Sequence, residues 1–206
     1  MKPPFCEYHL IDIELEKIDN LRSLVGDRKD VHIYQGDCNE LLLSKVFPRV
    51  RYEDFKRGLC VLDPYGLHLD WKVIQAAGEM RSFDIFLNFP VADINRNVLR
   101  RNTDRVRPAQ KARLNSFWGD ESWREIAYRK EGNLFGEPEK QTNDTIAEAF
   151  RTRLKKVAGF ARVPAPIPMR NSKGAIVYYL FFASQKGTAE HIVQDIFDKY
   201  RNYGER

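Results

Sequence analysis

The sequence predicts an α/β protein built on a mostly parallel, Rossmann-like sheet. Short apolar runs alternate four times with segments whose apolar residues recur at helical spacing. Three of these runs end at acidic residues, and the carboxyl ends of parallel strands are where open α/β sheets place their ligands. Near the end of the chain, two further apolar runs flank a short polar turn, which predicts an antiparallel strand pair.

The first half of the chain supplies the alternating elements in order. Gly26 is a predicted helix stop, and Asp70 is a predicted helix N-cap. The predicted strands are 8–14, 31–35, 59–62 and 83–89, and the predicted helices between them are 15–25, 40–46 and 70–80.

Residues 96–140 differ in character, because they are polar, basic and interrupted by Gly and Pro. They predict a mainly helical insertion in a single domain spanning 1–206. After it come a helix capped by Thr142 or Asn143, strands at 160–169 and 175–183, and a last helix. That helix starts at Thr188 and is expected to bury Ile192, Val193, Ile196, Phe197 and Tyr200.

Composition excludes several classes of protein. The chain has 206 residues, 43% of them hydrophobic, and no apolar run near the roughly 20 residues that span a bilayer. The N-terminus lacks the apolar core of a signal peptide, so we expect a cytoplasmic protein. The three cysteines are widely spaced without a C-x-x-C pattern, and we expect no metal site.

The net charge of +5 is concentrated in one segment. Between residues 96 and 113 there is a single acid, Asp104. This surplus predicts contact with phosphate or another acidic partner, with Arg96, Arg100 and Arg101 as contact residues, although a solvated helix face gives the same pattern. The basic residues are Arg96, Arg100, Arg101, Arg105, Arg107, Lys111 and Arg113.

Asp63-Pro64-Tyr65-Gly66 follows the third apolar run and is the most informative motif. Pro64 stiffens the backbone beside Asp63, and Gly66 permits a sharp turn. A carboxylate here accepts a hydrogen bond from an amine, and Tyr65 is a platform for a flat group. The alternatives are an ordinary tight turn and a tyrosine packed over the adjacent helix.

The other acids at strand ends are Asp12, Glu14 and Asp37. In nucleoside-binding sheets, the acid after the second strand accepts both ribose hydroxyls, because a carboxylate offers two parallel acceptors. The competing interpretation is that these acids cap the helices that follow. Asn88 ends an apolar strand, and we expect it to hold the neighbouring loop or to line a pocket.

Four segments together resemble the three-Cys-motif partner protein family. They are Tyr8 to Glu14, Tyr34 to Asn39, Val61 to Leu67, and Leu87 to Arg96, and the late Tyr178 to Ser184 is similar to that family's closing strand. The resemblance covers almost the whole chain. It implies a class I S-adenosylmethionine-dependent methyltransferase fold.

The resemblance also implies roles for particular residues. Glu14 and Asp37, with Asp12 beside them, would bind the nucleoside of S-adenosylmethionine. Asp63 and Tyr65 would orient the group that accepts the methyl. A three-Cys-motif protein encoded nearby is an implied partner.

One departure from the family pattern concerns the cofactor. Family members carry an additional first strand that ends in a glycine-rich loop, and no such loop occurs in this sequence. That strand would lie between the strands at 9–13 and 59–62, and its loss would leave two unpaired edges. We therefore expect the chain to be incomplete or inactive, and we expect its binding of the cofactor to be impaired. The unpaired edges also lead us to expect self-association. The alternative function is a non-catalytic component of a defence or mobile-element system that binds nucleic acid or protein.

Overall fold

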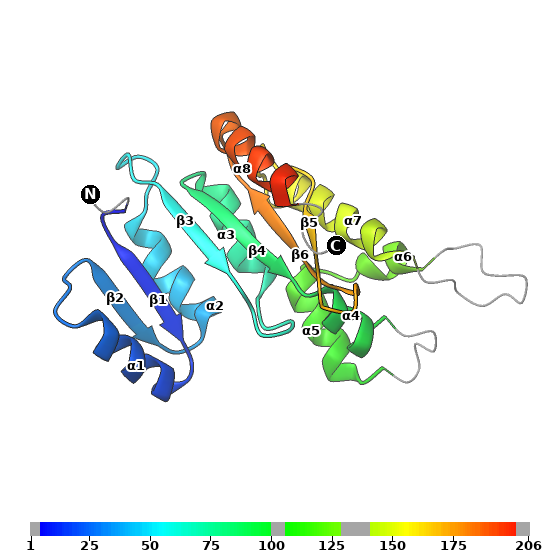
Figure 1. Cartoon of the computed structure of the whole chain (residues 1–206), viewed down its shortest axis with the longest axis horizontal. Helices are drawn as coiled ribbons and strands as arrows, with labels where there is room; N and C mark the ends of the chain where they lie inside the picture. Colours follow the sequence, from blue (N-terminus) through cyan, green and yellow to red (C-terminus); the bar gives the residue numbers. More distant parts are fainter. Residues whose placement is uncertain (1–4, 100–105, 129–140, 201–206) are drawn as a thin grey trace, which may run out of the picture. The chain divides into compact units, whose positions relative to one another are not determined.

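The computed structural model describes residues 5–99, 106–128 and 141–200. The chain forms two compact units, residues 1–51 and residues 52–206, and we describe each by itself (Figure 1).

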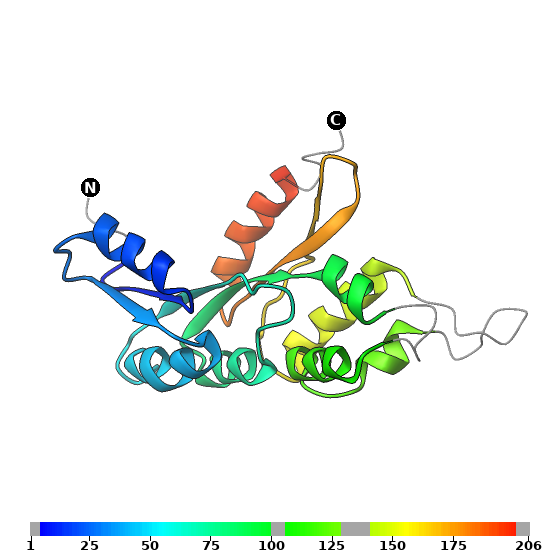
Figure 2. The ribbon, with the colours of Figure 1, turned by 90° about the horizontal axis from the view of Figure 1, so that it is seen from below.

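The first unit is a β-α-β element followed by helical turns. Its two strands are parallel, with Tyr8 opposite Val31 and Asp12 opposite Gln35. Helices α1 and α2 lie on opposite faces of this strand pair (Figure 2). The elements are β1 (Tyr8–Asp12), α1 (Leu15–Val25), β2 (Val31–Gln35), α2 (Cys38–Leu41), a π-helical turn (Leu42–Val46) and a 3-10 turn (Phe47–Arg49).

The buried apolar core of the first unit is small. Ile18 from α1 and Leu42, Val46 and Phe47 from the helical turns are its fully buried apolar side chains among the described residues. Of the ten strand residues, Gln35 is exposed and the other nine are half-buried. Gly26 ends α1, as the sequence predicts, with a φ of 58°.

The second unit is larger and contains a four-stranded mixed sheet in the order β3-β4-β6-β5. β3 and β4 are parallel, whereas β6 runs antiparallel to both β4 and β5. The elements are β3 (Gly58–Leu62), α3 (Trp71–Met80), β4 (Phe83–Phe89), α4 (Val91–Asn97), α5 (Pro108–Trp118), α6 (Trp123–Ala127), α7 (Asn143–Lys156), β5 (Ile167–Arg170), β6 (Ile176–Ala183) and α8 (Gly187–Tyr200).

The α/β class and the antiparallel pair near the end are confirmed, and β1 and β3 each keep one unpaired edge among the described residues, as expected without the family's first strand. The expectation of a mostly parallel sheet is wrong, because β6 pairs antiparallel with both of its neighbours. The strands divide into a two-stranded and a four-stranded sheet. Within the described residues, β1 pairs with β2 alone and β3 pairs with β4 alone. A local sequence pattern predicts that a strand forms, whereas hydrogen-bond partners at its edges depend on segments far away in the chain.

Both faces of the four-stranded sheet are covered by helices, with α8 on one face and α3, α5 and α7 on the other (Figure 2). Along β4, Phe83, Ile85, Leu87 and Phe89 are buried in strict alternation. The Phe89 ring centroid lies 4.6 Å from that of Phe150 in α7.

On the face that α8 covers, Phe86 of β4 contacts Phe182 of β6, with ring centroids 4.9 Å apart. Val193 and Phe197 of α8 and Ile167 of β5 belong to the same apolar cluster.

Two predicted elements near the end of the chain need correction. The strand predicted at 160–169 forms only from Ile167, and the last helix begins at Gly187. Ile192, Ile196 and Tyr200 are exposed, although they were expected in the core. The apolar stripe of α8 is wider than the strip that contacts the sheet, so periodicity alone overestimates burial.

The described part of 96–140 is helical. Pro108 occupies the first turn of α5, where its missing N–H costs nothing, and Gly119 ends the helix in a left-handed conformation. Thr142 then caps α7 by accepting a hydrogen bond from the Thr145 N–H. No helix in the described ranges is long and apolar enough to cross a membrane.

Candidate binding site at the end of β3

Asp63 lies directly after β3 and is held by a neighbour on β4. The Asn88 Nδ2 donates to Asp63 Oδ1 over 2.6 Å. The parallel register, with Leu62 opposite Leu87, explains this contact because it places the next residue of each strand side by side. The expectation that Asn88 holds the neighbouring loop is therefore confirmed, because Asp63 is the first residue of that loop.

The same amide leaves an acceptor without a partner. Asn88 Oδ1 is buried and accepts no hydrogen bond within the described part of the chain. A buried acceptor without a hydrogen bond lowers the stability of the folded state by on the order of 1–3 kcal/mol. The opposite amide orientation would face two oxygens toward each other at 2.6 Å, so the Asp63 carboxyl group determines how Asn88 is oriented.

Tyr65 is exposed to solvent over 91% of its surface. The alternative that it packs over the adjacent helix is therefore wrong. Gly66 turns the chain with a φ of 58°, and a Cβ there would lie 3.0 Å from Asp93 Oδ2. Both conditions favour glycine, so the loop presents Tyr65 on a constrained backbone.

A guanidinium and an imidazole lie next to this loop. Arg113 of α5 donates through Nη1 to His68 Nε2 over 2.6 Å, so this imidazole nitrogen acts as an acceptor. The His68 and Tyr65 ring centroids are 6.4 Å apart. The end of β3 thus combines a carboxylate, an exposed aromatic ring and a cation, which suits a flat ligand that carries an amine and a negative charge.

The three acids in the first unit have local structural roles. Asp12 accepts from the Glu14 N–H over 2.8 Å, and Asp37 caps α2 by accepting from the Asn39 N–H over 2.7 Å. Glu14 forms an ion pair with Lys17 at 2.8 Å and precedes α1 without capping it through its side chain. The capping interpretation therefore holds for Asp37.

The predicted site residues are distributed over both units. Asp12, Glu14 and Asp37 belong to 1–51, whereas Asp63, Tyr65 and Asn88 belong to 52–206. Arg96 lies in the last turn of α4 with its side chain exposed. The predicted contacts Arg100 and Arg101 lie outside the described residues.

One polar cluster in the first unit was not among the predicted sites. His9 of β1 stacks on His32 of β2, with ring centroids 4.9 Å apart, because the parallel register places them side by side. Glu7 Oε2 lies 3.3 Å from His9 Nε2 and 3.2 Å from Arg49 Nη2. The signal was a histidine at the second position of both consecutive strands.

The cluster changes the proton affinity of two of its members. Burial lowers the pKa of His9, and the neighbouring His32 lowers it further. The hydrogen bond from Arg49 lowers the pKa of Glu7. Among the described residues, no group of three or more His, Cys, Asp or Glu side chains is arranged to hold a metal ion.

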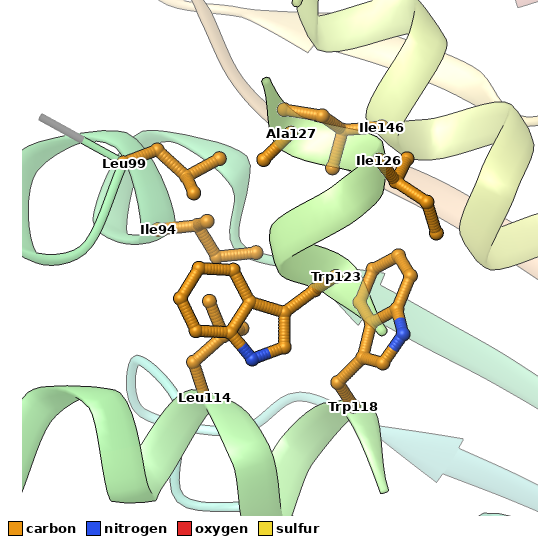
Figure 3. Close-up of a pocket in the computed structure, with 8 residues that line it drawn as sticks. All are labelled: Ile94, Leu99, Leu114, Trp118, Trp123, Ile126, Ala127 and Ile146. Atoms are coloured by element: carbon orange, nitrogen blue, oxygen red, sulfur yellow. The ribbon is translucent and has the colours of Figure 1, made fainter. Parts of the chain in front are cut away.

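A small apolar cavity in the second unit has no predicted site residue in its lining (Figure 3). Trp118 and Trp123 line it together with aliphatic side chains of α4, α5, α6 and α7. Its volume is about 10 Å³, measured as the space open to the centre of a water molecule. That is the minimum for one water, and the apolar lining offers little to bind it, so the cavity is a packing defect rather than a ligand site.

Comparison of the chain with protein-family models, with curated proteins and with solved structures found no match.

Proposed function

We propose that this protein is methyltransferase-like, in the sense implied by its resemblance to the three-Cys-motif partner family. In this proposal it retains the edge that binds a methyl acceptor but lacks a cradle for the cofactor. The observation that carries it is the Asp63–Asn88 hydrogen bond beside the exposed Tyr65, at the carboxyl end of two parallel strands.

The acceptor edge has the chemistry that a planar amine requires. Asp63 Oδ2 has no hydrogen-bond partner within the described ranges, so it is available to a ligand N–H. Tyr65 offers a ring face for stacking, which is worth about 1–3 kcal/mol per base in nucleic-acid complexes. Arg113 adds a positive charge beside the loop.

The cofactor side does not fit S-adenosylmethionine. The sequence has no glycine-rich loop. Gly36 follows β2 with a φ of 146°, and a Cβ there would lie 3.0 Å from the Leu41 side chain. The glycine therefore packs against α2 and does not form a binding site for the cofactor. Asp37 already uses one carboxylate oxygen to cap α2. We derive no methyl-transfer step for this chain.

Calorimetric titration with nucleosides tests the acceptor edge. We expect adenosine and cytidine, which carry an exocyclic amine, to bind more tightly than uridine, which lacks one. Asp63→Asn should remove that preference, and Tyr65→Ala should weaken all three ligands. Tyr52→Ala is the matched control because Tyr52 is also exposed but precedes β3. Equal affinity for the three nucleosides would contradict the proposal.

Titration with S-adenosylhomocysteine tests the cofactor side separately. We expect little or no heat and no rise in melting temperature. Tight binding that Asp37→Ala abolishes would show that Asp37 does bind the nucleoside and that the chain is complete enough to hold the cofactor.

A second candidate is binding of nucleic acid without catalysis, and α5 favours it. The helix carries Lys111 and Arg113, Arg107 immediately precedes it, and it contains no acidic residue. A phosphate backbone would be attracted by this charge, and binding would weaken as salt rises. Replacing Arg107 and Lys111 with Glu should abolish salt-dependent binding to an oligonucleotide, and an unchanged affinity would exclude α5 as the contact surface.

A further inference from the structure

The two outer strands of the four-stranded sheet differ in how their free edges are protected. β5 has only four residues, includes Pro168 and Arg170, and has a register shift between Met169 and Arg170. Proline, charge and irregular pairing are the usual protections of an exposed edge. β3, Gly58-Leu59-Cys60-Val61-Leu62, has no proline, charged residue or register shift. Its continuous apolar sequence is typical of a strand that is paired on both sides.

The direction of the backbone groups of β3 follows from one contact. The Gly58 N–H donates to Ser82 O over 2.9 Å, toward β4. Since these groups alternate along a strand, the N–H and C=O of Leu59 and Val61 point away from β4. They have no partner among the described residues, because β3 pairs with β4 alone.

The side chains of the same two residues are exposed as well. Val61 is 71% exposed and Leu59 is 42% exposed, and both lie on the α8 face beside Phe86 and Asp84 of β4. The edge of β3 therefore presents unsatisfied backbone groups and an apolar surface together.

We propose that β3 pairs antiparallel with β3 of a second copy of this chain, about a two-fold axis at Cys60. In this register, Leu59 lies opposite Val61 of the second copy, and the pair exchanges both backbone hydrogen bonds. The two-fold axis repeats this pair, so all four outward-pointing backbone groups of each β3 are satisfied. The four exposed apolar side chains then form one cluster on one face of the joined sheet.

Charge complementarity favours a second copy over an unrelated strand. The same register places Arg57 opposite Asp63 of the second copy, so each end of the paired strands joins a guanidinium to a carboxylate. Arg57 is exposed, with its guanidinium 3.9 Å above the Tyr52 ring, and Asp63 Oδ2 has no partner within the described ranges. This oxygen has two lone pairs, so it can accept from Arg57 of the second copy and from a ligand N–H together. An antiparallel arrangement is required, because a parallel copy would place like charges together.

Sedimentation velocity across the micromolar range tests the dimer. We expect a concentration-dependent dimer in the wild-type chain under reducing conditions. Val61→Lys should make the chain monomeric, because it puts two cations at the centre of the paired strands. Its side chain is exposed in one copy, so the fold should persist, which tryptophan fluorescence checks. Leu24→Lys is the matched control, since Leu24 is 83% exposed on α1 and should leave the dimer intact.

Cysteine cross-linking tests the register. Cys60 would lie opposite Cys60 of the second copy at a pair without hydrogen bonds, where Cα atoms are about 4.5 Å apart, within the range that a disulfide spans. With Cys6 and Cys38 replaced by serine, mild oxidation should give a covalent dimer, and the further change Cys60→Ser should abolish it. A chain that is monomeric at all concentrations, or a dimer that survives Val61→Lys and gives no Cys60 cross-link, would overturn the proposal.

Discussion

The two compact units achieve their order by different means. In residues 52–206, a continuous aromatic cluster fills the space between the sheet and its helices, with Phe150 contacting rings from β4, β6 and α5. In residues 1–51, the buried apolar core is small, and the two strands carry a stacked histidine pair with an ion pair beside it. A unit of about 50 residues has a low ratio of buried to exposed surface, so polar contacts matter more to it.

This contrast means that the two units should respond differently to mutation and to pH. The three tryptophans of the chain, Trp71, Trp118 and Trp123, all belong to residues 52–206. Tryptophan fluorescence therefore reports on one unit alone, and amide exchange in β1 and β2 reports on the other.

The largest effect is expected from Phe150→Ala. Phe150 is fully buried and contacts five aromatic side chains. Truncating a buried phenylalanine costs about 3–5 kcal/mol, so the urea midpoint of the fluorescence transition should fall sharply. Val157→Ala, at a half-exposed position just after α7, is the control and should have little effect. A loss below about 1 kcal/mol for Phe150→Ala would contradict the central role of this ring.

Ile18→Ala should have a comparable effect on the first unit only. Ile18 is completely buried, and an Ile→Ala change in a core costs about 2–5 kcal/mol. We expect amide protection in β1 and β2 to be lost while the fluorescence midpoint stays unchanged. An equal shift of both signals would show that the units unfold as one.

Gly78→Ala should destabilise the second unit to an intermediate degree. A Cβ at Gly78 would lie 1.8 Å from the Ala158 carbonyl oxygen, and backbone on both sides must move to relieve that clash. Overpacking of this kind typically costs about 1–3 kcal/mol. At Gly187 the nearest atom, Arg162 Nε, is 4.0 Å away, so Gly187→Ala is the control and should be tolerated in the same fluorescence assay.

The smallest effect is a pH dependence confined to the first unit. The folded state lowers the pKa of His9, so folding opposes its protonation, and stability falls as pH drops through the unfolded pKa of about 6.5 toward the folded value. The lowered pKa of Glu7 adds a further loss at more acidic pH. Amide protection of β2 should therefore decrease on acidification. His9→Gln should make this protection less dependent on pH near neutrality. A profile identical in wild type and His9→Gln would exclude the histidine pair as its cause.

Local features of this fold were readable from the sequence. The strand at Phe83–Phe89, the stop at Gly26 and the cap at Thr142 depend on neighbouring residues and appear where the pattern predicts. The break between β1 and β3 agrees with the missing strand that the family resemblance implies, whereas local residue patterns alone give no sign of it, because the partners of β1 and β3 are decided by distant segments.

The candidate site was readable in part for the same reason. Asp63 and Tyr65 were found because their loop follows a recognisable apolar strand, and Asn88 because an amide interrupts an apolar run. Arg113 joins the site only through the packing of α5, and its contact with His68 spans 45 positions in the chain. No spacing rule predicts such a contact.

The Asn88 side chain, whose buried Oδ1 has no partner among the described residues, couples the substitutions that positions 63 and 88 can tolerate. An aspartate at position 88 would set two carboxylates face to face at the end of β3, and a neutral residue at position 63 would remove the reason for the present amide orientation. In an alignment of relatives of this chain, positions 63 and 88 should therefore change jointly or not at all.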